Sequence, residues 1–281
     1  MTNNNEYKIS KNLCTASKLP ASDYVINPYI GCTHRCKYCY AQFMGRFTNH
    51  KEPWGTYIEP KKYISYGLPR DLKGKTILIG SVTDAYNPAE KHFRLMPNIL
   101  NSLTECYAHI EILTKSSLVL RDIDLIKKIP DVSVGLSLSN LNEYDNLIIE
   151  PGASSAEERL NTLAELHSQG IKTYLFISPY LPGITNLIEI YQKAQNHIDM
   201  ICVENLNLRG SYKREFLQII HSIHPDLYDL YVQIYTEKNG AGERYWNSIE
   251  EEINNLKKLS SVPVISYMYH NKIKKGARKN G

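Results

Sequence analysis

Short apolar runs rich in β-branched residues alternate with helical stripes along most of this chain of 281 residues, and this alternation constrains the fold more than any other feature. Six of the runs predict buried strands, at residues 24–30, 76–80, 110–114, 132–138, 171–177 and 200–203. Strands that alternate with helices pair in parallel through right-handed crossovers. Eight units close a full barrel, so six predict an open one: an α/β fold with a partial (β/α)6, TIM-like barrel of parallel strands and additional C-terminal helices.

The segments between the strands carry apolar side chains three or four positions apart, which is typical of helices. They predict helices at residues 88–107, 118–129, 185–197, 211–224 and 241–259. Pro97 predicts a kink or break in the first of these. The best-marked helix follows Ser154 and Ser155, which precede Glu157 and Glu158 at capping-box spacing, and Gly170 provides its C-terminal stop. A last strand at 262–268 contains Pro263, which favours a sheet edge or a strand start.

The length and the hydrophobic content of 42% favour one domain with a large core. We expect three parts within it: an N-terminal extension at 1–22, a barrel core at 23–210, and a C-terminal extension at 211–281 packed on the core. Residues 41–60 form a long loop, which we expect to act as a wall or lid. The chain ends in a basic tail, which either contacts phosphates or is solvated.

Composition leaves the partners open but indicates a compartment. The net charge of +4 neither requires nucleic acid nor excludes it. The first residues show no signal-peptide pattern, and no apolar run reaches the roughly 18 residues of a membrane span. The six cysteines suit a reducing environment. We therefore expect a cytoplasmic protein with no membrane contact.

Three cysteines, Cys32, Cys36 and Cys39, have the spacing C-x3-C-x2-C directly after the first predicted strand. Three thiolates can hold three corners of a [4Fe-4S] cluster, and no fourth cysteine lies near in sequence, so one iron would stay open for another ligand. A Cys3His zinc site with His34 is the alternative, although four ligands within eight residues make a poor tetrahedral cage. The isolated Cys106 and Cys202 read as buried apolar residues.

The motif, with Tyr40 directly after the third cysteine, resembles the cluster motif of the radical SAM superfamily. Its wider context, N-P-Y-x-G-C-x-x-x-C-x-Y-C-Y-A, resembles the spore photoproduct lyase-like branch, and most of the chain is similar to radical SAM mobile pair protein B. This resemblance implies a partial (β/α)6 barrel, a [4Fe-4S] cluster and S-adenosylmethionine (SAM). It also implies reductive cleavage of SAM to a 5′-deoxyadenosyl radical that abstracts hydrogen from a substrate.

Polar residues at the predicted strand ends extend the candidate site, because reactive groups collect at the carboxyl ends of parallel strands. The superfamily often has Gly-Gly-Glu after its second strand to bind the SAM amino group, and this chain departs from that pattern. Ser81, Thr83 and Asp84 could replace it, although Asp84 could instead cap the next helix. By position in the superfamily, the fourth strand and the helix after it meet the ribose and carboxylate of SAM.

That region supplies three further candidates, Ser137, Ser139 and Arg159. Arg159 could bind a carboxylate of SAM or form a surface ion pair with a neighbouring glutamate. Asn205 and Asn207, at the end of the sixth strand, read as substrate or cofactor contacts. The predicted cofactor contacts are thus Tyr40, Ser81, Thr83, Asp84, Ser137, Ser139, Arg159, Asn205 and Asn207.

The resemblance implies an electron donor such as flavodoxin or ferredoxin, and its mobile-pair part suggests a second radical SAM protein as partner. Three functions compete. The first is a lyase-like radical SAM enzyme acting on nucleic acid, and the second is a radical SAM enzyme that modifies a peptide or a small molecule. The third is a zinc-binding protein without catalysis.

Overall fold

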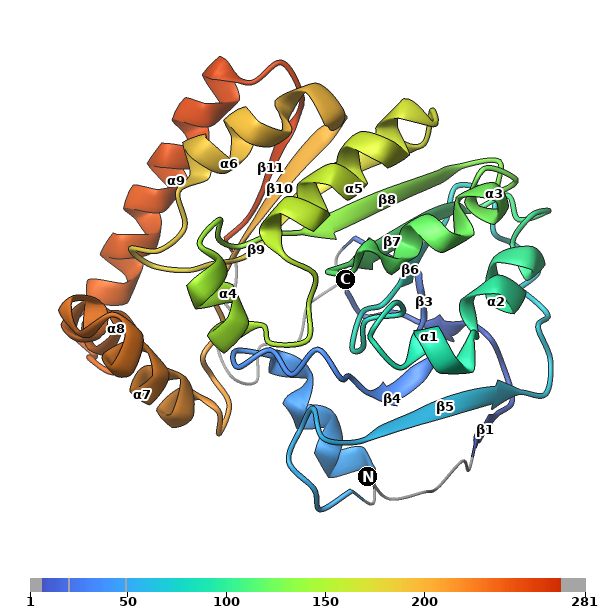
Figure 1. Cartoon of the computed structure of the whole chain (residues 1–281), viewed down its shortest axis with the longest axis horizontal. Helices are drawn as coiled ribbons and strands as arrows, with labels where there is room; N and C mark the ends of the chain where they lie inside the picture. Colours follow the sequence, from blue (N-terminus) through green and yellow to red (C-terminus); the bar gives the residue numbers. More distant parts are fainter. Residues whose placement is uncertain (1–6, 20, 49, 269–281) are drawn as a thin grey trace.

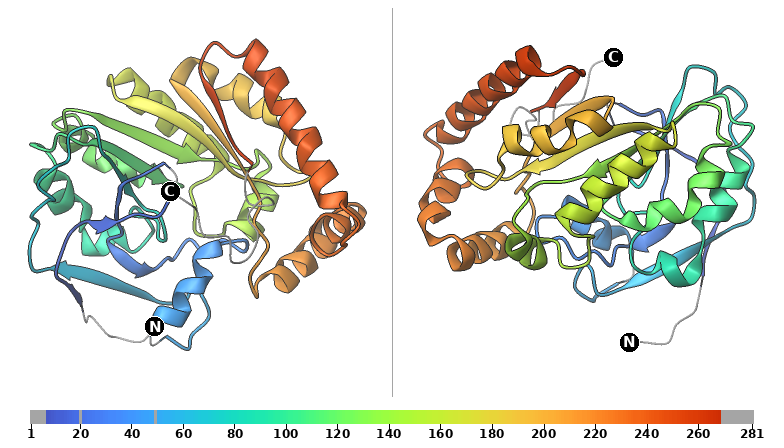
Figure 2. Two further views of the ribbon diagram at one scale, coloured as in Figure 1. Left: turned by 180° about the vertical axis from the view of Figure 1, so that it is seen from behind. Right: turned by 45° about the horizontal axis from the view of Figure 1, so that its top comes forward.

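The computed structural model describes residues 7–19, 21–48 and 50–268, which form a curved sheet with helices on its outer face (Figures 1 and 2). The sheet has eight strands in the order β11-β10-β9-β8-β7-β6-β3-β2. The seven strands from β3 to β11 in this order pair in parallel, and β2 pairs antiparallel with β3. The strands are β2 (Thr15–Ala16), β3 (Tyr24–Ile26), β6 (Thr76–Ile79), β7 (His109–Thr114), β8 (Val132–Ser137), β9 (Lys172–Tyr180), β10 (Met200–Asn205) and β11 (Val264–Tyr267).

The two edges of this sheet, β2 and β11, do not pair with each other, so the barrel is open as predicted. The α/β class, the parallel pairing and all six predicted barrel strands are confirmed, and β11 lies at an edge, as Pro263 indicated. A second sheet of three strands, β1 (Lys8–Ser10), β5 (Ile58–Tyr63) and β4 (Tyr29–Gly31), lies beside the open side of the barrel (Figure 1).

Burial along the barrel strands explains the layers. In β7, Ile110 and Ile112 are fully buried on the outer face, whereas Glu111 between them is partly exposed on the inner face. The central strand β8 is buried throughout. The outer face packs against helices, and a continuous apolar core lies between the two layers. The helices are α1 (Glu90–Phe93), α2 (Met96–Ser102), α3 (Ile123–Ile126), α4 (Glu143–Ile149), α5 (Ala156–Ser168), α6 (Leu187–Ala194), α7 (Lys213–Ile223), α8 (Tyr228–Tyr235) and α9 (Ala241–Leu259).

The predicted strand at 24–30 was wrong in one respect, because it is two strands in different sheets. Asn27 and Pro28 interrupt it, and Pro28 has no backbone N–H for a sheet bond. The Asn27 side chain instead donates to Ser81 Oγ at 2.9 Å and accepts from the Val82 backbone at 3.0 Å. The chain therefore leaves the barrel at Ile26 and enters the small sheet as β4, which leads into the cysteines.

Two other segments differ from the sequence prediction. The loop at 41–60 contains the 3-10 helix η1 (Tyr40–Phe47) and the start of β5, and the helix at 118–129 is the 3-10 helix η2 (Ser117–Asp122) followed by α3. The break near Pro97 is confirmed: α1 ends at Arg94, which has a left-handed φ of 50°, and Pro97 lies in the first turn of α2.

The capping box of α5 is confirmed in full. Ser155 accepts from the Glu158 backbone, and the Glu158 carboxylate accepts from the Ser155 backbone. Gly170 follows with a φ of +75°, a conformation that favours glycine. This helix carries Arg159, so its start fixes a residue that lies beside the barrel interior.

The division at residues 22 and 210 stays a prediction, although the C-terminal part contributes β11 to the main sheet. The basic tail beyond Met268 lies outside the described residues. Across the described ranges, no helix is both long enough and apolar enough to span a membrane.

Candidate active site

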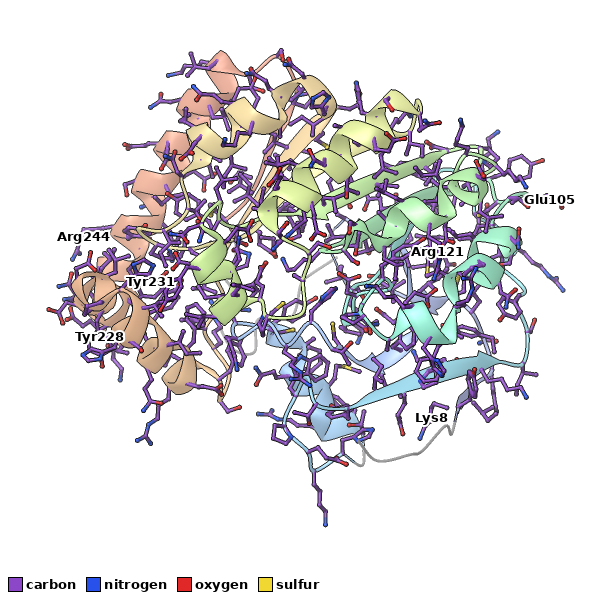
Figure 3. The ribbon with its side chains drawn as sticks, viewed as in Figure 1. Lys8, Glu105, Arg121, Tyr228, Tyr231 and Arg244 are labelled. Carbon is purple, nitrogen blue, oxygen red and sulfur yellow. The ribbon has the colours of Figure 1, made fainter. Side chains whose placement is uncertain are left out.

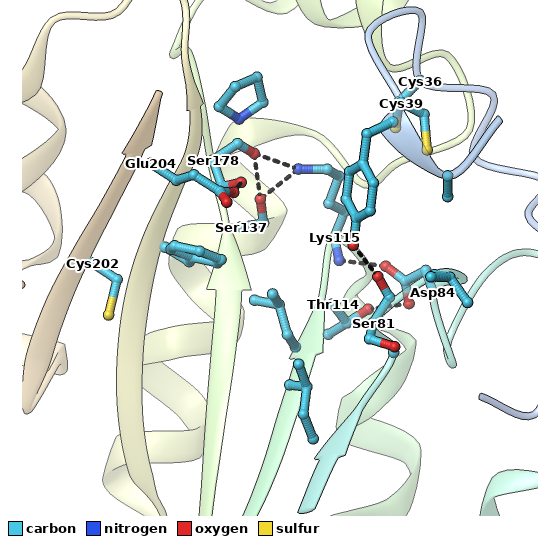
Figure 4. A pocket seen from close by; sticks show the side chains of 18 of the residues that line it. Cys36, Cys39, Ser81, Asp84, Thr114, Lys115, Ser137, Ser178, Cys202 and Glu204 are labelled. Carbon is cyan, nitrogen blue, oxygen red and sulfur yellow. Dashed lines mark hydrogen bonds between the residues drawn. The ribbon is translucent and has the colours of Figure 1, made fainter. Parts of the chain in front are cut away.

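A cavity of about 260 Å³ extends from the carboxyl ends of the barrel strands into the concave face of the sheet. The segment that carries the three cysteines, 32–39, forms one wall, and we call it the cysteine loop. Strands β9, β10 and β11 form the opposite wall, where Ser178, Cys202 and Glu204 lie (Figure 4). The inner-face residues of β6, β7 and β8 lie between these walls.

Close backbone contacts fix the cysteine loop. Gly31 has a φ of +87°, and a Cβ there would lie 2.5 Å from the Tyr57 carbonyl oxygen, so only glycine fits. Thr83 Oγ1 donates to the Gly31 carbonyl at 2.6 Å. On the other side, a Cβ at Gly152 would lie 2.5 Å from the Thr33 carbonyl oxygen. The loop is therefore held between the end of β6 and the segment after α4.

The thiols of Cys32, Cys36 and Cys39 all line this cavity, and none forms a disulfide. Burial raises the pKa of the Cys32 thiol to about 12, and the Asp84 carboxylate adds to the rise. Burial also raises the pKa of Cys36 and Cys39. Positive charge is needed to ionise these thiols, and iron would supply it. Three free thiols on one loop fit the donor set of a [4Fe-4S] cluster.

His34 lies between the cysteines, but both of its ring nitrogens contact other groups of the protein. Its Nδ1 lies 2.7 Å from the Gly152 carbonyl oxygen and its Nε2 lies 3.0 Å from Asp84 Oδ2. This geometry disfavours the Cys3His zinc site.

Seven of the nine predicted cofactor contacts line the same cavity: Tyr40, Ser81, Thr83, Asp84, Ser137, Asn205 and Asn207. The structure thus brings together residues from the ends of three strands, β6, β8 and β10, and Tyr40, which directly follows the cysteine loop. One of them, Asp84, already has several donors. It accepts from Thr114 Oγ1 at 2.7 Å, from the Lys115 backbone at 2.8 Å and from the Tyr86 backbone at 2.8 Å, besides its contact with His34. Asp84 therefore ties β6 to β7 and orients His34.

The remaining two predicted contacts, Ser139 and Arg159, are not among the residues that line the cavity. Arg159 is 1% exposed, so the surface ion pair expected as its alternative is wrong: its ion pair with Glu150, at 2.7 Å, is buried. Its guanidinium also donates to the Ser137 carbonyl at 2.8 Å. Arg159 thus acts behind the cavity wall, because side chains in the first turns of α5 point at the strand ends from outside.

The sequence pattern indicated no role for Lys115, which directly follows β7, and gave no sign of Glu150. Lys115 Nζ lies 3.3 Å from Glu150 Oε1, donates to the Ser178 carbonyl at 3.0 Å, and bonds Ser137 Oγ (Figure 4). Tyr38, inside the cysteine motif, donates its hydroxyl to Glu150. The position of Lys115 after a strand was a usable signal, whereas nothing in the sequence marked Glu150.

The Glu150 carboxylate is an ion in a buried position. Desolvation would raise its pKa, but Lys115, Arg159 and the Tyr38 hydroxyl outweigh that effect and lower it to about 2. Lys115 in turn is the only lysine or arginine among the described residues that line the cavity. This single cation lies close enough to Cys36 and Cys39 to lower the pKa of both thiols against the effect of burial.

Residues 26–194 match the family model described as the radical SAM superfamily, which is more than half of the chain. This chain belongs to the radical SAM superfamily. Enzymes of this family use a [4Fe-4S] cluster and SAM and need an electron donor. The family match agrees with the resemblance that the cysteine spacing indicated.

Two relatives indicate the range of the similarity. An uncharacterized protein of Methanocaldococcus jannaschii is 39% identical over 243 residues, which is 86% of this chain and 89% of that protein. A radical SAM Nα-GlyT isomerase of a Pseudomonas phage is 25% identical over 229 residues, which is 77% of this chain but 46% of that protein.

Solved structures share the fold at low sequence identity. A spore photoproduct lyase mutant with bound AdoMet and dinucleoside spore photoproduct has a TM-score of 0.63 at 14% identity, covering 92% of this chain and 81% of its own. SuiB of Streptococcus suis bound to S-adenosylmethionine has a TM-score of 0.51 at 13% identity, covering 86% of this chain and 49% of its own. Both therefore support the partial-barrel architecture.

Proposed function

We propose that Cys32, Cys36 and Cys39 hold a [4Fe-4S] cluster and that the protein cleaves SAM reductively to start a radical reaction. The observation that carries this proposal is the placement of three free thiols, two buried and that of Cys39 partly buried, on one loop that faces the polar strand ends. When bound, the cluster and SAM supply an electron and a 5′-deoxyadenosyl radical that abstracts hydrogen from the substrate. The residues of this chain bind and orient the reactants and exclude water.

Lys115 is the group that we assign to the carboxylate of SAM. It is the cation of the cavity wall next to the cysteines, and Ser137 and the Ser178 carbonyl fix its ammonium group. A carboxylate accepts strongly from such a fixed donor. Glu150 and Arg159 then act as positioning residues, because they hold Lys115 and the Ser137 strand end without lining the cavity.

The other predicted contacts fall into groups by their position in the cavity. Ser137, Asn205 and Asn207 line the cavity at the ends of β8 and β10 and remain our candidates for contact with SAM or substrate, with Ser137 Oγ also bonded to Lys115 and to the Ser178 carbonyl. The Tyr40 hydroxyl donates to the Ser81 carbonyl, so Tyr40 would present its ring to the cofactor. The side chains of Ser81, Thr83 and Asp84 bond the protein itself, and we propose that they shape the wall where the SAM amino group would lie.

The substrate divides the proposal into two versions. A nucleic-acid substrate is supported by the shared fold with a spore photoproduct lyase whose structure contains a dinucleoside photoproduct. A peptide or small-molecule substrate is the alternative. Flavodoxin or ferredoxin as electron donor, a second radical SAM protein as partner and a cytoplasmic location stay predictions.

The two substrate versions predict different binding. A nucleic-acid enzyme should bind DNA or RNA with an affinity that falls steeply with salt, because released counterions drive such binding. Deleting residues 272–281 should weaken the binding if the basic tail contacts phosphates. Fluorescence anisotropy with labelled oligonucleotides at several salt concentrations measures both effects, and binding that neither salt nor the deletion changes would contradict this version.

The enzyme proposal has its own test in the anaerobic product. Incubation of the reconstituted protein with SAM and dithionite should yield 5′-deoxyadenosine, measured by chromatography. A protein that binds zinc in place of iron and sulfide, and forms no 5′-deoxyadenosine, would support the non-catalytic alternative instead.

A further inference from the structure

The half of the cavity remote from the cysteine loop has a chemistry of its own. Cys202 and Glu204 lie there on β10, across the cavity from Cys36 and Cys39 (Figure 4). Because side chains alternate along a strand, β7 contributes Glu111 to this inner face between the outward-facing Ile110 and Ile112. Burial is the main reason why the pKa of the Cys202 thiol is raised, and the nearby carboxylates of Glu111 and Glu204 raise it further. We call this half the cavity floor.

Aromatic rings line the cavity floor beside the carboxylates. Tyr174 is 5% exposed and lies over Gly135, where a Cβ would come within 2.2 Å of the ring. The glycine on β8 thus makes room for a tyrosine on β9. Phe176 and Tyr267 complete the lining, with ring centroids 6.0 Å apart and ring planes at 79° to each other, an edge-to-face arrangement. Such rings offer faces and edges to a ligand of modest size.

The negative charge of Glu111 is poorly balanced by the protein. Its ion-pair partner within the described ranges is the His109 imidazole, whose Nε2 lies 3.9 Å away and whose Nδ1 is itself 3.0 Å from Asp131. No hydrogen bond to the Glu111 carboxylate occurs within the described ranges, and its side chain is 23% exposed, toward the cavity. The one lysine of the cavity wall, Lys115, is bound to Glu150 and Ser178 instead.

Burial raises the pKa of Glu111 above its ordinary value, and His109 offsets only part of that rise. A carboxylate in such a place is stabilised by a ligand that brings a positive charge. Aromatic faces attract cations as well, so the rings and the carboxylate favour the same kind of ligand. An anion, by contrast, would meet Glu111 and Glu204 at close range.

We propose that the substrate brings a primary amine, as an ammonium group, to the cavity floor, where Glu111 binds it among the rings of Tyr174, Phe176 and Tyr267. This inference rests on the proposed function only in taking the cavity as the substrate site. Glu111 is then a specificity-determining residue for substrates that carry an amino group.

The test is isothermal titration calorimetry on the full-length chain with its reconstituted cluster and SAM, in the absence of reductant. The probes are n-butylamine, n-butanol and butyrate, which have the same chain length and differ in charge. The wild type should bind the amine about tenfold or more tightly than the alcohol, since a charge-assisted hydrogen bond and a cation–π contact contribute on this scale. Butyrate should bind more weakly than either.

Glu111→Gln keeps the shape of the side chain and removes its charge, so most of the preference for the amine should be lost and only the contribution of the rings should remain. Glu111→Asp keeps the charge and should retain part of the preference, which guards against a fold defect in the first variant. Glu105→Gln is the matched control, because Glu105 is exposed at the far edge of the molecule (Figure 3), and it should bind as the wild type does. Equal affinity for amine and alcohol in the wild type, or a preference that survives undiminished in Glu111→Gln, would overturn the proposal.

Two further probes distinguish the sources of the amine. Nα-acetyl-lysine amide represents a peptide, and a thymidine dinucleotide carrying an aminoalkyl group represents a modified nucleic acid. At least one should bind better than its acetylated form, and failure of both would count against the proposal. Because no reductant is used, amine binding is measured independently of SAM cleavage, so either proposal can fail while the other stands.

Discussion

Two buried glutamates, Glu90 and Glu150, have nearly the same partners but different neighbours. Each accepts from a tyrosine hydroxyl, Tyr29 for Glu90 and Tyr38 for Glu150, and each pairs with an arginine. Glu90 lies on α1 and meets Arg121, which is labelled in Figure 3, at 2.6 Å. Neither Glu90 nor Arg121 lines the cavity, whereas the Glu150 network includes Lys115 and Tyr38, which do.

The same combination of a glutamate, a tyrosine and an arginine thus has a different role in each place. Glu90 also accepts from the Leu95 and Met96 backbones, at 2.9 and 3.1 Å, and so joins α1 to α2. Its network holds the outer layer together. Glu150 makes the same kind of contact with Tyr38 of the cysteine loop and with Lys115, which faces that loop. Its network therefore fixes the geometry of the site.

The largest expected effect is on stability, from removing either charge. Glu150→Gln should lower the free energy of unfolding by about 3–5 kcal/mol, because it leaves the buried Arg159 without its carboxylate partner. Glu90→Gln should lower it by less, because Arg121 is partly exposed and keeps its ion pair with Asp122 at 2.6 Å. Only Glu150→Gln should also weaken SAM binding, measured by calorimetry on protein that is still folded. An equal loss of SAM affinity in both variants would break the comparison.

The pH dependence of unfolding should come next in size. The folded-state pKa of Glu150, about 2, is below the unfolded value of about 4.3, so its contribution is present above pH 4.3 and is lost as the pH falls toward 2. That contribution is about 3 kcal/mol, from 1.36 kcal/mol for each pKa unit. Denaturant unfolding between pH 5 and 2.5 should show the wild type losing its advantage over Glu150→Gln, and parallel curves would contradict the assignment.

Lys115→Met should reduce the affinity for SAM by about 10- to 100-fold, because a hydrogen bond to a charged group is worth about 1.5–3 kcal/mol. Arg121→Met, in the Glu90 network, is the matched change of a cation that does not line the cavity. It should lower stability and leave SAM affinity near the wild-type value. Equilibrium binding of SAM to the two variants compares them directly.

The smallest effect should come from the start of α5, the helix that carries Arg159. Ser155→Ala removes one side of the capping box and should cost about 1 kcal/mol of stability in denaturant unfolding. Since the later turns of α5 stay packed, SAM affinity should not change. A clear loss of SAM affinity would mean that the cap, and with it Arg159, positions the site more strongly than its distance along the helix indicates.

The sequence predicted the barrel because local patterns determine it: each strand is a short apolar run and each helix has its own stripe. It missed the break at Asn27 and Pro28, since both sides of the break are equally apolar and only the pairing partners separate them. It also gave no warning of α8, which lies beside α9 in the C-terminal part.

The candidate site was predictable to the extent that residues lie next to each other in sequence. The cysteine spacing and the polar strand ends are local features, and the structure brings most of them to one cavity. Glu150 contacts Tyr38 across 112 positions, and no local pattern reports such a pair. Arg159 has a side chain that could bind a carboxylate, and it lies in the first turns of the predicted helix. Its guanidinium, however, is already paired with Glu150 behind the cavity wall.

The most direct test of the central claim is an anaerobic count of iron and sulfide, followed by an assay for 5′-deoxyadenosine with SAM and dithionite. The wild type should bind about four irons and form 5′-deoxyadenosine. Changing Cys36 to alanine should abolish the product, whereas Cys106→Ala, which removes a buried cysteine away from the cavity, should keep the cluster. Full SAM cleavage in Cys32→Ala, Cys36→Ala and Cys39→Ala alike, or a wild type that binds no iron, would contradict the account.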